Sequence, residues 1–392
     1  MKMDKAVFLN NISNQMKFGT AKLCFILGAG ASKDCGIPTA KELTTMWFAE
    51  LLGEINIVDE WKRILCAEED VRATAINMLC TDSKLLDKVL RCSKWNINRQ
   101  LNLEDFIRIK FVKGVTESYS ELFAYRYPDA ELRNRVIEEF IGKAKVKAGH
   151  RALANVLADK INNVVITTNF DRLIEQAINK NNTAINIRKM NHAGDDTCDA
   201  FRGNSFSNAF LNSNPPLIIK AHSEITRRGL INTPEEIRYL PDSFFMKLQT
   251  IFSNYTPVFI GYAGTDIAFV DMLLRYARSS ANEKRGCFWL IYGKDNDHPE
   301  DLVNDRIKEY VKLVNGKFVM HNGFEKIMPE IAEKVLQSAN RIRNHASITQ
   351  NAVDNPPILR DDNKVSGNTS MEDLEMKFFG MSRKENIYVR RG

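Results

Sequence analysis

The residues of this sequence that are best suited to catalysis or ligand binding lie in four turns. Each turn directly follows a short apolar run. The first is Gly28-Ala29-Gly30-Ala31-Ser32, which follows the run Leu23–Leu27. Glycines between a strand and a helix let the backbone approach a pyrophosphate, and the amides that open the next helix face the anion. The turn lacks the third glycine of the usual dinucleotide fingerprint, so it is not an ordinary dehydrogenase loop. The alternative is a structural glycine turn with Ser32 as a helix N-cap.

The second and third turns carry polar side chains. Thr168-Asn169-Phe170-Asp171 ends the second apolar run, where the Asn169 amide is suited to orienting a ribose or a water. Asp171 is equally suited to being a plain N-cap of the next helix. The third turn places His222 after the run Leu217–Lys220. Histidine is a base near neutral pH, although a lone histidine is often only a structural residue.

The fourth turn is Gly261-Tyr262-Ala263-Gly264-Thr265-Asp266. Its glycines allow close approach of the backbone to a ligand, and Asp266 is either a helix N-cap or a polar contact to that ligand. Ligands of open α/β sheets bind at the carboxyl ends of the strands. Four such turns on one sheet edge are therefore more specific than any one of them.

The elements that must position these turns are short strands alternating with helices. Six apolar runs of strand length show little polar alternation, as expected for parallel strands covered on both faces. Helix-period stretches follow the second and fourth turns, at Asp171–Lys180 and Asp266–Ala281. We expect an α/β fold with a Rossmann-like parallel sheet. The runs are Leu23–Leu27, Val164–Thr168, Leu217–Lys220, Pro257–Tyr262, Cys287–Tyr292 and Lys317–Met320.

The predicted sheet is interrupted by a long helical segment, which divides the chain. Residues 1–40 and 162–344 are expected to form the Rossmann-like domain, and residues 41–161 an all-helical insertion that covers the sheet or walls off a cleft. Residues 345–392 read as a linker and a tail for docking or oligomerisation. The helix-period stretches of the insertion are Lys41–Leu52, Asp70–Leu79, Leu103–Tyr119, Glu131–Ile141 and His150–Ile161.

Composition excludes several classes of protein. A chain of 392 residues with 44% hydrophobic residues can bury a large core. The 55 basic and 49 acidic residues leave a net charge of +6, which does not demand a nucleic acid. The seven cysteines include no C-x-x-C pair, which predicts free thiols in a reducing compartment and no metal knuckle. With no signal peptide and no membrane-spanning apolar run, we expect a cytoplasmic protein without membrane contact.

Taken in chain order from about Lys22 to Phe324, the four turns resemble those of the sirtuin family. Gly28–Ser32 with Gly36-Ile37-Pro38 is similar to the sirtuin phosphate loop, and Thr168–Asp171 to the stretch near the nicotinamide ribose. Lys220-Ala221-His222 resembles the segment of the catalytic histidine. The resemblance implies a sirtuin-like fold and NAD as the ligand.

Three departures from the deacylating sirtuins shift the implied activity. The cysteines cannot build the four-cysteine zinc module, Ser223 replaces the glycine after the histidine, and Thr39–Leu43 replaces an Asp-Phe-Arg sequence. The chain thus resembles the divergent prokaryotic branch, best known from antiphage defence, whose members hydrolyse NAD. Deacylation or ADP-ribosyl transfer, and a non-catalytic nucleotide-binding subunit, are the alternatives.

The resemblance also implies roles for single residues. Asn169 would position the water and the ribose hydroxyls, His222 would act as a base, and Asp171 would tune the site, without a metal. A homo-oligomer with a separate HerA-like ATPase partner is expected by analogy. Direct nucleic-acid binding is not expected, because the basic stretch 143–151 has the spacing of a solvated helix face. The expected NAD contacts are Gly28, Ala29, Gly30, Ala31, Ser32, Ile37, Pro38, Thr168, Gly261, Tyr262 and Asp266.

Overall fold

The structure is a computed structural model, and it describes somewhat more than half of the sequence. The described residues are 1–18, 22–40, 42–43, 119–158, 162–181, 188–191, 216–222, 240, 242–279, 284–294 and 296–338. The helices expected within 41–118 and the tail 345–392 lie outside these residues, apart from the short stretch at 42–43.

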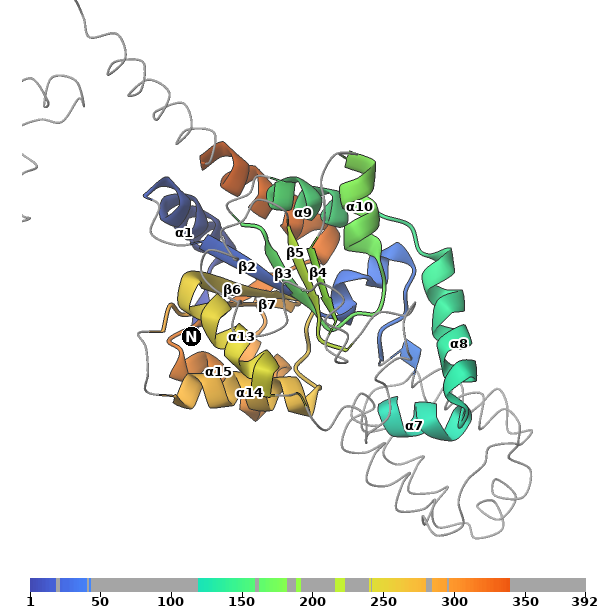
Figure 1. Ribbon diagram of the computed structural model, residues 1–392. Helices are drawn as coiled ribbons and strands as arrows, with labels where there is room; N and C mark the ends of the chain where they lie inside the picture. Colours follow the sequence, from blue (N-terminus) through green and yellow to red (C-terminus); the bar gives the residue numbers. More distant parts are fainter. Residues whose placement is uncertain are drawn as a thin grey trace, which may run out of the picture. The chain divides into compact units, whose positions relative to one another are not determined.

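Eight parallel strands form one sheet, which confirms the predicted Rossmann-like fold (Figure 1). The strand order is β1-β8-β7-β6-β2-β3-β5-β4. From β5 through β8 this is the doubly wound order of dinucleotide-binding folds, with the first long strand, β2, at the centre. The strands are β1 (Lys2–Met3), β2 (Lys22–Leu27), β3 (Val164–Thr167), β4 (Arg188–Asn191), β5 (Leu217–Lys220), β6 (Tyr255–Ile260), β7 (Phe288–Tyr292) and β8 (Lys317–His321).

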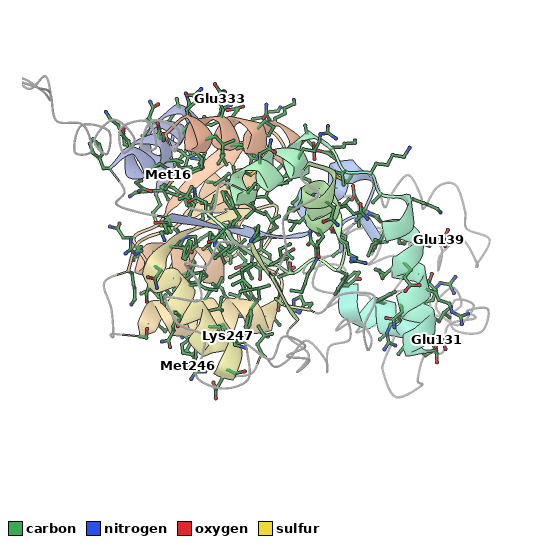
Figure 2. All side chains as sticks on the ribbon, turned by 45° about the horizontal axis from the view of Figure 1, so that its top comes forward. Met16, Glu131, Glu139, Met246, Lys247 and Glu333 are labelled. Carbon is green, nitrogen blue, oxygen red and sulfur yellow. The ribbon has the colours of Figure 1, made fainter. Side chains whose placement is uncertain are left out.

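Alternate residues of the central strands enter two separate cores, one on each face of the sheet. On β2, Cys24 and Ile26 join the core under α13 (Asp242–Asn254), α14 (Ile267–Arg278) and α15 (Asp305–Leu313). Leu23, Phe25 and Leu27 join the opposite core. Figure 1 shows α13, α14 and α15 gathered on one side of the sheet, and Figure 2 shows side chains filling the space between the layers.

The opposite face is covered by α1 (Lys5–Lys17), α9 (Ala148–Ala158), α10 (Leu173–Asn181) and a helix over 324–338. Short polar side chains start several of these helices, as N-caps do elsewhere. Asp4 accepts hydrogen bonds from the amides that open α1, and Asn304 accepts one from Ile307 at the start of α15. The helices thus cover both faces of the sheet. Because all strands are parallel, their carboxyl ends lie at the same edge of the sheet.

The helical segment between β2 and β3 includes α7 (Tyr119–Arg126), α8 (Ala130–Lys143) and α9. On α8, Glu131 and Glu139 (labelled in Figure 2) are exposed and pair with residues one turn along the same helix. In contrast, α9 buries Leu153 and Val156 in the second core, so this helix belongs to the layer that covers the sheet. The division of the chain at residue 161 stays a prediction. Each helix in the described part of the chain is too short or too polar to span a lipid bilayer.

Candidate functional site at the carboxyl edge of the sheet

The turns after β2 and β6 contact each other through their backbones. The Gly30 amide donates a hydrogen bond to the carbonyl of Gly261 over 2.9 Å, and the Gly28 amide donates to that of Ile260 over 3.2 Å. A Cβ atom on Gly28 would lie 2.5 Å from the Tyr262 Cα, and one on Gly261 would overlap the Ala31 nitrogen. Gly261 also has a φ of 66°, which favours glycine. These glycines are therefore required by the packing of one turn on the other.

The expectation that a helix with its N-terminus facing an anion follows the first turn is wrong. The segment after β2 forms two 3₁₀ turns, η1 (Ala29–Ala31) and η2 (Lys33–Cys35), and not an α-helix whose N-terminus faces an anion. The amides of Ala31 and Ser32 donate within the turn, to the carbonyls of Gly28 and Ala29. The alternative of a Ser32 N-cap is also wrong, because the Ser32 side chain caps neither turn.

The Ser32 hydroxyl instead links the first and second turns. It donates a hydrogen bond to Asp171 Oδ2 over 2.7 Å and lies 3.0 Å from Asn169 Nδ2, which donates to it. Asn169 Nδ2 also donates to the Gly28 carbonyl over 2.9 Å, so both of its protons are used in holding the loop. In the part of the chain that the structure describes, Asn169 Oδ1 has no hydrogen-bond partner. The amide is thus fixed in place with one acceptor left for a ligand or a water.

Asp171 is held from two sides. Its Oδ1 accepts a hydrogen bond from the Leu173 amide over 3.0 Å, so the carboxylate helps to start α10 as well as binding Ser32. Behind it, the buried ammonium of Lys220 donates to the Asp171 carbonyl and lies 3.4 Å from Glu175 Oε1. Lys220 and Glu175 are almost fully buried, and the sequence analysis missed this ion pair. The sequence signal that could have predicted the pair is Lys220, a charged residue at the end of an apolar run.

His222 joins the third turn to the fourth. Its Nε2 is hydrogen-bonded to Asp266 Oδ2, and Asp266 Oδ1 accepts a hydrogen bond from the Phe269 amide as the N-cap of α14. The prediction that Asp266 is a helix N-cap is therefore confirmed, whereas its contact with a ligand stays a prediction. In the neutral imidazole that donates from Nε2 to Asp266, Nδ1 is an acceptor. His222 Nδ1 is buried and has no hydrogen-bond partner among the described residues.

The other residues predicted to contact NAD mainly pack against the cores or pair with the backbone. The Tyr262 ring packs against Phe269 and Trp289 in the first core, where burial raises the pKa of its hydroxyl. Ile37 packs against the second core, and the Thr168 amide donates to the Leu27 carbonyl, tying the end of β3 to β2. Pro38, next to Ile37 in the chain, is half-buried.

The segment after Pro38 starts a helix. Thr39 Oγ1 accepts a hydrogen bond from the Glu42 amide, and Glu42 Oε2 accepts one from the Thr39 amide over 2.9 Å. This is a capping box, in which two side chains satisfy two free amides reciprocally. Glu42 Oε1 also lies 2.9 Å from Lys33 Nζ, so the same side chain ties the helix back to the loop after Ser32.

Comparison with known proteins agrees with this architecture. A family model described as SIR2-like domain matches residues 163–312, from the start of β3 into α15. The chain contains a SIR2-like domain. The match begins after the Gly28–Ser32 turn, so that turn is joined to the SIR2-like domain by the strand pairing and hydrogen bonds above. No match was found among curated proteins.

Two solved structures resemble the chain over most of its length. One is a triple mutant of a Sir2 homologue in complex with 2′-O-acetyl ADP ribose, with 12% identity and a TM-score of 0.39. It covers 85% of this chain and 96% of its own. The other is a complex of a Sir2 homologue with NAD, with 12% identity, a TM-score of 0.36 and coverage of 85% and 94%.

Among the described residues, the cysteines are Cys24, Cys35 and Cys287, and all three are free and buried. Burial and the nearby Glu325 carboxylate raise the pKa of the Cys35 thiol to about 11. Cys35 lies beside His150 and Glu325, a cluster that the sequence analysis did not predict.

Proposed function

We propose that the SIR2-like domain binds NAD at the carboxyl edge of β2, β3, β5 and β6 and hydrolyses the bond between nicotinamide and ribose. The observation that carries this proposal is the fixed amide of Asn169, whose Oδ1 is left unpaired while Nδ2 is held by two hydrogen bonds. It lies where the strand order reverses around β2, the usual ligand crevice of doubly wound sheets.

The reaction needs few groups. Water adds its oxygen to the ribose C1′, the C1′–nitrogen bond breaks, and nicotinamide leaves as a neutral molecule with the bonding electron pair. ADP-ribose forms and the water gives up one proton. The transition state resembles an oxocarbenium ion, as in glycoside hydrolysis. The enzyme must therefore place the water, stabilise positive charge and accept a proton.

The described side chains match these requirements. Asn169 Oδ1 is an acceptor that can orient the water or a ribose hydroxyl, and His222 Nδ1 is an acceptor for the released proton. Asp266 holds the opposite ring nitrogen and balances the charge of the imidazolium that results. Asp171 Oδ2 accepts from Ser32 and its Oδ1 from the Leu173 amide, so we assign it a positioning role.

The capping box favours hydrolysis over deacylation. Thr39 and Glu42 are committed to starting a helix where deacylating sirtuins carry Asp-Phe-Arg after Gly-Ile-Pro. Features linked to acyl-lysine handling are thus replaced by a local structural motif, which favours water over an acyl-lysine as the acceptor of the ribosyl group.

The test is product analysis with NAD, with and without an acetyl-lysine peptide. We expect nicotinamide and ADP-ribose in equal amounts without the peptide. Asn169→Ala and His222→Ala should each lower the rate by roughly 10²-fold or more, whereas His298→Ala, at an exposed histidine, should not change it. O-acetyl-ADP-ribose formed only with the peptide would identify a deacylase. NAD binding without nicotinamide release would identify a regulatory subunit, and activity that survives both site variants would refute the assignment.

We further propose that the hydrolase is gated within an antiphage defence system, as a homo-oligomer with a HerA-like ATPase in the cytoplasm. Support comes from the resemblance to the divergent sirtuin branch, and from the fact that unregulated loss of NAD kills the host cell. The test is coexpression with such an ATPase during phage infection. NAD loss that depends on infection and on Asn169 supports gating, and NAD loss that is equal without infection refutes it.

A further inference from the structure

Cys35, His150 and Glu325 come from three separate segments and meet beside the loop that carries Ser32. Cys35 ends η2, His150 lies in the first turn of α9, and Glu325 lies in the first turn of the helix over 324–338. We propose that these three side chains bind a divalent transition-metal ion of the zinc class. The proposal goes beyond the proposed NAD hydrolysis and does not depend on it.

The donor atoms lie close to the spacing of metal ligands. Cys35 Sγ lies 3.4 Å from His150 Nδ1 and 3.8 Å from Glu325 Oε1, and the latter two atoms are 3.9 Å apart. Zinc bonds of about 2.3 Å to sulfur and 2.0–2.1 Å to nitrogen or oxygen in a tetrahedron put donor atoms about 3.3–3.6 Å apart. An ion therefore fits after shifts of a few tenths of an ångström.

The cluster is held in shape by its surroundings. Glu325 Oε2 accepts a hydrogen bond from the Gly149 amide over 2.8 Å, which orients Oε1 toward Cys35 and His150. The Phe324 ring packs against His150 with its centroid 5.0 Å away, and it fills the space that a Cβ on Gly149 would need. Supporting contacts of this kind fix the ligands of metal sites.

The donor types select the ion. A thiolate, an imidazole and a carboxylate together suit zinc and its cobalt substitute, and they do not suit calcium or magnesium, which prefer oxygen ligands. Binding replaces the thiol proton with the metal–sulfur bond and releases that proton to solvent. Three protein ligands leave a fourth position for water. The low exposure of Cys35 and His150 keeps competing water away from the other donors.

A bound ion would clamp the loop to two helices of the second core. Cys35 is three residues from Ser32, which holds Asn169 and Asp171. The Cys35 carbonyl also accepts a hydrogen bond from the amide of Lys145, which lies between α8 and α9. The metal would thus stiffen the segment that fixes the Asn169 amide.

The test is metal titration of the full-length, chelator-treated protein. Cobalt alone should give the ultraviolet band of a cobalt–thiolate bond, and zinc alone should displace it. Cys35→Ala should lose one equivalent of bound metal and its share of the band. Cys287→Ala, a matched change at another buried free cysteine, should bind like the wild type. Glu325→Gln, which keeps an acceptor for the Gly149 amide, should weaken binding at least about tenfold.

Two outcomes would overturn the proposal. One is a Cys35→Ala protein that binds as much zinc as the wild type. The other is a wild-type protein that binds no zinc at micromolar concentration, which would make the cluster a hydrogen-bonded network only. If Cys35→Ala does not fold, judged by circular dichroism, the Glu325→Gln titration decides in the same way.

Discussion

The contact between the turns after β2 and β6 predicts an unusual pattern of glycine-to-alanine effects. Two causes of destabilisation, close backbone contact and left-handed φ, occur separately or together at three glycines, and a fourth glycine has neither. Gly28 has the contact but an extended φ of −113°, and Gly286 has a φ of 74° with no neighbour of its Cβ nearer than 3.6 Å. Gly261 has both, and Gly142 in α8 has neither.

The magnitudes follow from these two causes. A left-handed φ costs an alanine about 1–2 kcal/mol, and forced overpacking costs about 1–3 kcal/mol. Gly28→Ala should therefore lower the free energy of unfolding by about 1–3 kcal/mol and Gly286→Ala by about 1–2 kcal/mol. Gly261→Ala should lower it by roughly 2–5 kcal/mol, the sum of both. Gly142→Ala should raise it by about 0.5–1 kcal/mol, because alanine favours a helix.

The assay is urea denaturation of the four variants followed by circular dichroism. The informative comparison is Gly28→Ala with Gly142→Ala, since neither involves a left-handed φ. If Gly28→Ala is as stable as Gly142→Ala, the turns do not pack as described, and the structural explanation of the glycines in the first turn is refuted.

Three further predictions concern the polar groups. Lys220→Met should destabilise the fold by about 3–5 kcal/mol in urea denaturation, because it removes the ammonium that pairs with the buried Glu175 carboxylate, and the added change Glu175→Leu should restore most of it; no restoration would contradict a direct pair. Ser32→Ala should lower kcat for NAD more than it raises KM, because the hydroxyl positions the Asn169 amide; an effect on KM alone would argue against this. Burial lowers the pKa of His321 from its usual 6.5. The folded protein therefore resists protonation there, and stability should fall as the pH drops through about 6.5. His321→Gln should flatten this slope in thermal melts, and an unchanged slope would exclude His321 as its source.

The sequence predicted the sheet well because its central strands are nearly pure apolar runs. All six predicted strands are present, including β2 and β6. The two missed strands lack that signal, since β1 has two residues and β4 reads Arg-Lys-Met-Asn. The helices α1, α13 and α15 were also missed, although Asp4 and Asn304 stand as N-caps before two of them.

The candidate site was predicted in position but not in its connections. Local sequence placed Asn169, His222 and Asp266 in turns that follow strands, where they are found. It did not show that His222 bonds Asp266, because that contact depends on the order of strands across the sheet. The cluster of Cys35 with a histidine and a glutamate was missed for the same reason: spacing along the chain says nothing about ligands brought together from three distant segments. Catalytic roles for Asn169, His222 and Asp171 stay predictions.

The strand order also constrains how this protein is made. The central strand β2 pairs with β3 and β6, and its Leu23 lies opposite Thr256. During synthesis, β2 must wait for more than half of the chain before its second neighbour leaves the ribosome. Such distant pairings slow folding and leave apolar strands unpaired meanwhile. We therefore expect the nascent chain to need chaperones, and ribosome-bound fragments that end before β6 to be sensitive to protease.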